Sequence, residues 1–284
     1  MTYAVFLNLT RANMHPTEYK IGPNQFSAAI RDIAAGVRQW RLSIALTSED
    51  IRIRFKRTQI GILWTTLSFM LFVWVKVLIF TPFVTVDPTY FTNYVAINYF
   101  VWMFVSAVLS DGCQVFVNAE RWLKGGRFPL SVFVNVSMMR STVFSAFNFA
   151  VIVIMFIIYK IAVTPAAVVS LFVFLLLLIS GYSVHFVLGA ICARFRDVSH
   201  LVQAILRVMF FLTPIFWMPD QIGALWRYLQ FNPFAHYLIA FREPLLSGEV
   251  PMLSLYVVAG CSLSLVFASL IALVVARRRI VFWL

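Results

Sequence analysis

Four cations stand within six residues at Arg52, Arg54, Lys56 and Arg57, directly before a long apolar segment. Guanidinium and ammonium groups bind phosphate oxygens, so this cluster could hold the anionic head of a lipid. The charge also has a simpler use, because Lys and Arg are retained on the cytoplasmic side when a helix inserts into a membrane. On either interpretation the cluster marks the point where the chain enters the bilayer.

No group of residues indicates covalent or metal chemistry. The four histidines are scattered, the three cysteines are widely spaced without a CxxC pair, and no HExxH or nucleophile motif occurs. There is also no GxxxxGK[ST] phosphate loop, so ATP that drives this protein would be hydrolysed by another polypeptide. We therefore expect no catalytic residue, no metal and no cofactor bound by this chain.

Two ionisable residues, Lys76 and Asp111, lie within apolar segments. A lysine at the centre of a bilayer costs ~2.5–3.5 kcal/mol on insertion scales. Lys76 either snorkels to the surface or faces a water-filled path, where it could meet Asp111. At spacings of three and four it shares a helical face with four aromatic residues, Phe69, Phe72, Phe80 and Phe83.

The elements that position these residues are predicted to be membrane helices. The 284 residues are 62% hydrophobic and 12% charged, too little polar surface to cover a soluble globule. The net charge of +12 fits anionic lipid and topology better than nucleic acid. Gaps between charged residues accommodate six apolar segments of ~20 residues, at about 57–87, 94–117, 140–160, 160–194, from 198, and 249–277.

We thus predict an all-α integral membrane protein with six transmembrane helices. The chain is expected to form a single transmembrane domain over 1–284, with an N-terminal region at 1–60 and the six spans at 61–284. Cations are concentrated in the inner segments, whereas the outer ones carry only Lys160, Arg227 and Arg242. Both termini are therefore predicted to be cytoplasmic.

An amphipathic pattern begins at Phe26, too polar to span a membrane. It predicts an N-terminal interfacial helix, or a helix packed on another subunit, with charged residues such as Asp32 on its polar side. Thr47 and Asp50 resemble a capping box and predict a second helix that starts there. The apolar stripe consists of Ile30, Ile33, Val37, Trp40 and Ile44.

Two further stretches interrupt the pattern of spans. Residues 213–248 are apolar but cut by four prolines, which predicts short re-entrant helices at 220–230 and 235–246 between the fifth and sixth spans, or else an ordinary outer loop. The first inner loop, 118–130, predicts a short helix at 118–124 ended by two glycines and a proline. It is either a compact knob that docks into a partner or a plain positively charged loop.

These stretches resemble one family. Residues 54–64 are similar to the RYRRT-x-LG-x-LW motif of the permease subunits of type-2 ABC exporters for O-antigen, capsule and related polysaccharides. Residues of the inner loop match that family's N-x-x-L-I-K-K-x-x-F-P segment, and Phe195-Arg196-Asp197 resembles its Y-R-D. Thr213-Pro214-Ile215-Phe216 and Asn232-Pro233 resemble its S-P-I-F and N-P. The resemblance covers residues 30–284 in order.

The resemblance implies a homodimeric channel in the bacterial inner membrane that exports a lipid-linked glycan to the periplasm. Two ATP-binding cassette subunits, which would bind ATP and Mg, are expected on its cytoplasmic face. The cations at Arg52, Arg54, Lys56 and Arg57 would then meet the lipid headgroup of the substrate. The residues expected to couple to the ATPase are Asn118, Glu120, Leu123, Lys124, Phe128, Pro129, Arg196 and Asp197.

Aromatic rings can pack on the apolar faces of sugars, but they also gather at membrane interfaces in any membrane protein. A secondary transporter is the less favoured alternative, because it should show internal repeats and charges in several spans. The same scaffold could also carry teichoic acid or a small hydrophobic molecule. The candidate translocation path consists of Phe69, Phe72, Lys76, Phe80, Phe83, Asp111, Trp217, Trp226, Tyr228, Phe231, Phe234 and Tyr237.

Overall fold

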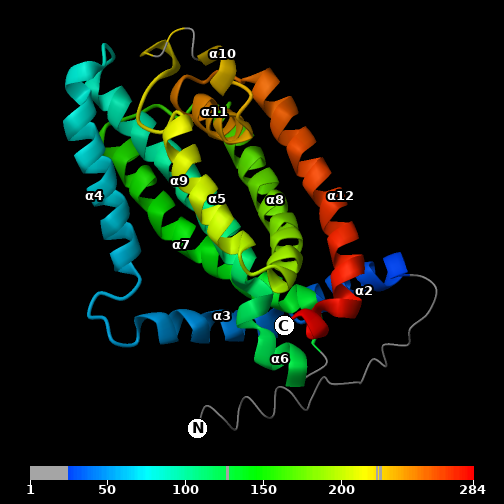
Figure 1. Ribbon diagram of the computed structural model, residues 1–284. Coiled ribbons are helices and arrows are strands. Elements are labelled where there is room, and N and C mark those ends of the chain that lie inside the picture. The colour runs from blue at the N-terminus through cyan, green and yellow to red at the C-terminus, as the bar shows by residue number, and fades with distance from the viewer. Residues whose placement is uncertain (1–24, 126–127, 222, 224–225) are drawn as a thin grey trace.

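The computed structural model describes residues 25–125, 128–221, 223 and 226–284, and all regular structure in these ranges is helical. The long helices stand side by side as a bundle, with shorter helices at both ends (Figure 1). The α-helices are α2 (Gln25–Arg38), α3 (Trp40–Phe55), α4 (Leu63–Phe80), α5 (Pro88–Asn118), α6 (Glu120–Gly125), α7 (Leu130–Ile158), α8 (Ala167–Arg194), α9 (Val198–Leu212), α10 (Trp226–Leu229), α11 (Pro233–Leu246) and α12 (Met252–Trp283).

Five helical segments in the described part of the chain are long and apolar enough to cross a membrane: Leu63–Phe83, Pro88–Gly125, Leu130–Ile158, Ala167–Arg194 and Met252–Arg277. The chain is therefore a multi-pass membrane protein. The predicted count of six is not confirmed, because α9 has only 15 residues and is ~22 Å long at 1.5 Å per residue. It nevertheless runs along the bundle from the end near α3 and α6 towards α11 (Figure 1).

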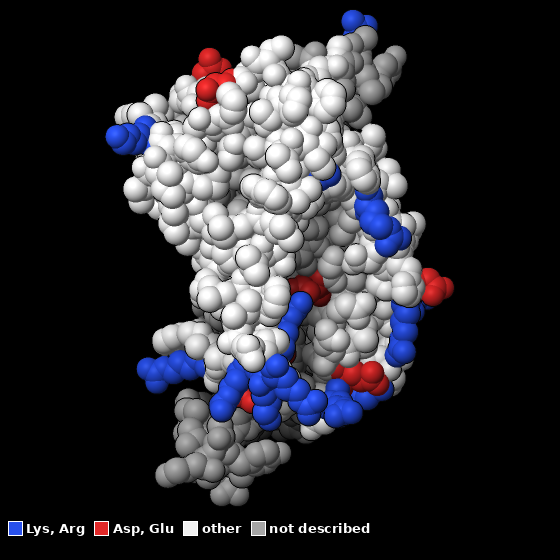
Figure 2. Space-filling model, turned by 90° about the vertical axis from the view of Figure 1, so that its left-hand side faces the viewer, with Lys and Arg blue, Asp and Glu red and all other residues white. Residues whose placement is uncertain are grey.

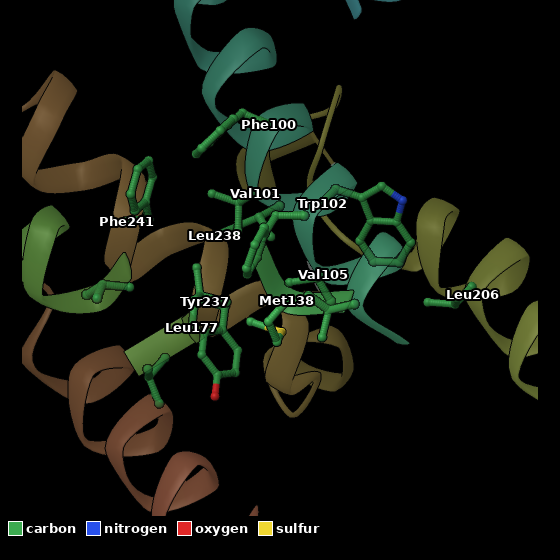
Figure 3. Packing of buried hydrophobic residues seen from close by; sticks show 14 of the residues in the cluster. Phe100, Val101, Trp102, Val105, Met138, Leu177, Leu206, Tyr237, Leu238 and Phe241 are labelled. Atoms are coloured by element: carbon green, nitrogen blue, oxygen red, sulfur yellow. The ribbon is translucent and has the colours of Figure 1, made fainter. Parts of the chain in front are cut away.

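Helix α5 forms the centre of the bundle and packs on α4, α7, α8, α9 and α11. Most of its length is buried, as expected for a span surrounded by other helices. Figure 3 shows Tyr237, Leu238 and Phe241 of α11 lying among Val101 of α5 and Leu177 of α8. By contrast, α4 has large exposed apolar side chains along much of its length. That face of α4 is available to lipid or to another subunit.

The N-terminal helices lie across one end of the bundle, the end where α12 also finishes (Figure 1). The second helix, α3, begins at Trp40 and not at Thr47, so the predicted capping box is wrong. The Thr47 hydroxyl donates to the carbonyl of Ser43 at 2.7 Å, as in a helix interior. Both side chains are buried, and the Thr47 hydroxyl also lies 3.4 Å from the Val136 carbonyl of α7.

Asp32 of α2 is buried, so its predicted place on the polar outer side is also wrong. Its carboxylate accepts the backbone N–H groups of Leu130 at 3.3 Å and Ser131 at 3.1 Å, at the amino end of α7. The guanidinium Nε of Arg277 in α12 lies 3.5 Å away. Donors that a helix start leaves unpaired are satisfied in this way, and the carboxylate suits the positive end of the α7 dipole.

Most of the predicted apolar stripe of the N-terminal helices points away from the bundle, and only Ile33 packs against the core. Val37 and Trp40 have 62% and 52% of their surface exposed, and Ile30 and Ile44 are also exposed. This arrangement is the reverse of a soluble amphipathic helix, which buries its apolar side against its own protein. The exposed stripe is available for a membrane surface or another subunit.

The stretch after α9 is broken as predicted, but the pieces differ. Residues 213–218 are non-helical, a 3₁₀ turn covers Pro219–Gln221, and α10 has four residues. The second helix, α11, begins at Asn232-Pro233, where the Asn232 side chain accepts the N–H of Phe234 as a cap. Because α11 packs among α5, α8 and α12, it does not behave as an exposed outer loop.

Candidate functional site

The non-helical segment 213–218 is held by side chains of α5. The amide of Asn98 donates to the carbonyl of Pro214 at 3.0 Å, and the Tyr94 hydroxyl donates to the carbonyl of Trp217 at 3.0 Å. Irregular backbone at membrane depth requires such internal partners, because lipid offers none. These bonds fix the segment against the centre of the bundle.

Arg242 of α11 completes this arrangement and is only 4% exposed. Its guanidinium donates to the Asn98 side-chain oxygen at 3.2 Å, pairs with Glu243, and lies 4.2 Å from the centre of the Tyr94 ring. From its sequence context Arg242 is expected to be an ordinary outer cation. The signal that could have identified it is the adjacent carboxylate within an apolar helix, because a buried charge needs a partner.

Lys76 of α4 lies against this same segment. Its ammonium is 4.5 Å from the centre of the Phe216 ring and 5.5 and 5.6 Å from those of Phe72 and Phe80. Cation–π contacts of this kind stabilise a cation by about 0.5–2 kcal/mol, depending on desolvation. Lys76 therefore lies at the junction of α4 and segment 213–218, half-buried among rings.

Asp111 does not meet Lys76. It forms an ion pair with Arg140 of α7 at 3.2 Å and accepts the Ser141 hydroxyl at 3.2 Å. The pairing with Lys76 is predicted because both residues interrupt apolar spans. However, Lys76 lies near the end of α4, whereas α5 starts at Pro88 and continues for more than twenty residues before it reaches Asp111. The two charges therefore lie at different depths in the bundle.

The four phenylalanines around Lys76 have different surroundings. Phe69 is buried, and Phe72 stacks on Tyr99 with ring centres 3.7 Å apart. Phe80 packs on Phe216, whereas Phe83 lies beyond α4 and is 74% exposed. Phe69 and Phe72 thus hold α4 against α5, and the face predicted as one lining surface is divided between core and exterior.

The outer aromatic residues do not form one surface either. Tyr237 is buried, with its hydroxyl 2.8 Å from Ser180 and 3.2 Å from Ser262. Phe234 packs edge-on against Trp102, and Phe231 is 80% exposed. The indole of Trp217 donates to the Phe211 carbonyl at 3.1 Å. Trp226 is half-buried, and the side chain of Tyr228 lies outside the described part of the chain.

Arg140 joins helices at the other end of the bundle, a role that its sequence context does not indicate. Its guanidinium pairs with Asp50 of α3 as well as with Asp111 of α5. It also lies 3.4 Å from the Ser137 hydroxyl. We call these four residues the Arg140 cluster. One cation thus connects the N-terminal helix to two membrane helices.

The cluster extends to α8 through His185. The ring Nδ1 lies 2.8 Å from the Gly181 carbonyl, which can only accept, so Nδ1 carries the proton. The other ring nitrogen, Nε2, then accepts the Ser137 hydroxyl at 3.0 Å. This arrangement satisfies a neutral imidazole within the bundle, so His185 is a structural residue here.

The predicted lipid-facing cations Arg52, Arg54, Lys56 and Arg57 are all exposed. The Arg54 guanidinium lies 5.4 Å from the Phe144 ring of α7, and the ring of Phe55 packs edge-on against the same residue. The end of α3 is thus anchored while its charges stay outside. Figure 2 shows that Lys and Arg gather at one end of the molecule, with fewer of them towards the other.

The predicted knob forms helix α6, which projects from the same end (Figure 1). It starts at Glu120, not at Asn118, which closes α5. Glu120 and Lys124 pair at 2.7 Å across one turn, and Arg196 is near enough to act on the Glu120 charge. Arg196 and Asp197 are exposed in the turn before α9.

Leu123 does not have the predicted position of a docking anchor, because it is 7% exposed and packs within this chain. Phe128 is half-buried and Pro129 is buried at the start of α7. The exposed side chains of α6 are those of Arg121, Trp122 and Lys124, and the Trp122 ring packs edge-on against Phe128, with ring centres 5.8 Å apart. The surface of α6 is therefore formed by an aromatic ring and two cations.

Comparison with known proteins agrees with this architecture, although no family model matches the chain. Two O-antigen export system permease proteins RfbA from Klebsiella pneumoniae are 22% identical over 211 residues and 21% identical over 235 residues. They cover 74% and 79% of this chain and 82% and 88% of the relatives. A protein of the same name from Myxococcus xanthus is 24% identical over 225 residues, 77% of this chain and 86% of its own.

The chain is similar to O-antigen export permeases. The comparison confirms the resemblance to permease subunits of type-2 ABC exporters that the motifs indicated. Within the described residues, no three His, Cys, Asp or Glu side chains gather as metal ligands. The features available to such a permease are therefore its exposed cations, its aromatic junction at Lys76 and the surface of α6.

Proposed function

We propose that this protein is the transmembrane subunit of an ATP-driven exporter that moves a lipid-linked polysaccharide from the cytoplasm to the periplasm. The observation that carries the proposal is similarity to O-antigen export permeases over three quarters of the chain. The multi-pass helical structure supports it. O-antigen, capsule or a similar glycan is the proposed cargo.

The proposed location is the bacterial inner membrane, with both termini in the cytoplasm. The end of the bundle with α2, α3 and α6 carries most of the cations, and α12 ends there as well (Figures 1 and 2). Such charge is retained on the cytoplasmic side. Helix α9 and the extended segment 213–218 would together make the sixth crossing, which gives one transmembrane domain over 1–284.

Two copies of this chain and two ATPase subunits would form the complete exporter, with ATP and Mg bound by the ATPases. Support for a second copy comes from the exposed apolar residues of α4 and α9, which include Trp74, Leu78, Val208 and Phe211. The exposed side chains of α6, Arg196 and Asp197 support contact with the ATPase on the cytoplasmic side. In this arrangement Lys76 and Phe216 lie where α4 meets segment 213–218, and we propose that this junction borders the path.

The test is to purify the chain with its ATPase, reconstitute the complex in lipid nanodiscs, and measure ATP hydrolysis. Addition of a lipid-linked polysaccharide should raise the rate several-fold, whereas the free polysaccharide should not. A complex whose ATPase lacks its catalytic carboxylate serves as the control. Stimulation by teichoic acid or by a small hydrophobic molecule, with no response to the lipid-linked glycan, would contradict the proposed cargo.

A further inference from the structure

A groove of about 500 Å³ lies at the end of α7 opposite to the cation-rich end of the bundle. Its walls are Ile152, Val153, Phe156 and Ile157 of α7, the connection that follows them, and Leu245 of α11. This volume falls within the ~300–1,000 Å³ of small-molecule sites. The lining is apolar except at Lys160, which stands at its edge.

Lys160 adopts an unusual backbone conformation, with φ of 53°. It follows the last turn of α7, where the Ile161 N–H donates to the Phe156 carbonyl at 3.0 Å and the Lys160 N–H donates to the Ile157 carbonyl at 3.3 Å. These two bonds define a Schellman motif, in which the left-handed position usually holds glycine. The backbone conformation alone would therefore favour glycine at this position. The presence of a lysine indicates a role for its side chain.

The charge of Lys160 is available to a ligand. Among the residues that the structure describes, it has no ion-pair partner. Beside it, Ile157 and Val163 are largely exposed apolar side chains. A cation next to an apolar groove on the outside of a membrane helix matches a molecule with a negative head and a hydrocarbon tail.

We propose that this groove binds an anionic phospholipid, with one acyl chain along α7 and the phosphate at Lys160. The phosphate supplies the negative counter-charge that Lys160 lacks among the described residues, and the acyl chain covers the exposed groove. With the topology proposed above, the lipid would belong to the outer leaflet. This is a bound bilayer lipid and not the exported substrate, because none of the residues that line the groove belongs to α4 or to segment 213–218.

The test measures lipid bound to the purified full-length chain by native mass spectrometry during titration with phosphatidylglycerol or phosphatidylcholine. Lys160→Gly should fold at least as stably as the wild type, since glycine suits the backbone. It should bind phosphatidylglycerol about fivefold more weakly, the factor that corresponds to ~1 kcal/mol for one cation at an anionic surface. Phosphatidylcholine binding should change little.

Two variants serve as matched controls. Lys160→Arg keeps the charge and should retain phosphatidylglycerol binding, whereas Val153→Trp fills the groove and should weaken both lipids. Equal binding of phosphatidylglycerol to wild type and Lys160→Gly would overturn the proposal. Stronger binding of a polyprenyl phosphate than of phosphatidylglycerol at the same residues would do so too, as would a second copy of the chain that occupies the groove. None of these results depends on transport activity.

Discussion

Arg140 contacts carboxylates from two other helices, Asp50 of α3 and Asp111 of α5. Its side chain is mostly buried, and its Nε lies buried without a partner among the described residues. A charge in this position needs its partners, since removal of one leaves another unpaired. Because Asp50 and Asp111 are partly exposed, solvent screening makes each pair weaker than a fully buried one.

We therefore expect Arg140→Gln to lower the free energy of unfolding by about 2 kcal/mol, and Asp50→Asn by about 1 kcal/mol. Thermal unfolding of the purified protein in detergent measures both. In a double-mutant cycle the two substitutions should not add, because they remove one shared pair. Strictly additive effects would show that Asp50 and Arg140 do not interact.

Asp32 should make stability depend on pH. Burial raises the pKa of Asp32 above its ordinary value of 3.8, and this outweighs the bonds from Ser131 and Leu130 and the attraction of Arg277, which lower it. The folded protein thus holds this proton more tightly than the unfolded chain. The contribution of Asp32 to stability is greatest below pH 3.8 and declines as the pH rises through the raised value.

Asp32→Asn should remove this dependence while its amide oxygen still accepts a backbone N–H. Its melting temperature relative to wild type should rise with pH across that window. Asp32→Ala loses the cap as well and should cost about 0.5–2 kcal/mol at every pH. A constant difference between Asp32→Asn and wild type at all pH values would contradict the raised pKa.

At the scale of elements, α2 docks onto the start of α7 through Gly36. A Cβ atom built at Gly36 would lie 2.7 Å from the Ser131 Cβ, closer than side chains approach, and the Ser131 hydroxyl already donates to the Asp32 carbonyl at 2.6 Å. Neither group can move without breaking the contact between the helices. The close approach of α2 and α7 therefore requires glycine at this position.

Gly36→Ala should lower the free energy of unfolding by about 1–3 kcal/mol, the usual cost of overpacking. It should also speed proteolytic cleavage near α2. The matched control is Gly260→Ala, because a Cβ at Gly260 meets nothing within 4 Å, so helix propensity alone should favour alanine there. Equal stability of the two variants would argue against tight docking of α2.

The helix α6 has separate inner and outer sides. Leu123 is buried in this chain, whereas Trp122 is 42% exposed. Trp122→Ala should weaken binding of the proposed ATPase partner by about 2 kcal/mol, because loss of a tryptophan side chain at an interface often has an effect of this size. The melting temperature should change little. Leu123→Asp should instead lower the melting temperature. Calorimetric titration of this protein with the proposed ATPase distinguishes the two variants, and unchanged binding by Trp122→Ala would remove this side of α6 from the proposed interface.

At the scale of the whole molecule, the sequence was sufficient to predict the long apolar helices and the broken stretch after α9. Hydropathy and proline positions are local properties, so one chain reveals them. Asp32, Arg140 and Arg242 were misjudged because their partners are distant. The bonds Leu130–Asp32, Arg140–Asp50 and Arg242–Asn98 span 98, 90 and 144 residues. The local sequence pattern shows that a charged residue lies in an apolar segment, but it does not show which distant residue pairs with that charge.

The burial of Arg242 has a consequence for how the chain is assembled. On its own, α11 would carry an arginine into hydrocarbon, which is costly. The contacts that reduce this cost come from Asn98 and Tyr94, which are synthesised about 140 residues earlier on α5. We therefore expect α11 to enter the bilayer only after α5 and α8 have packed together and the side chains of α5 can contact Arg242. A chain arrested before α11 would thus lack the helix that completes the Asn98 and Tyr94 site, and it would also lack α12, whose Arg277 pairs with Asp32 at the other end of the bundle.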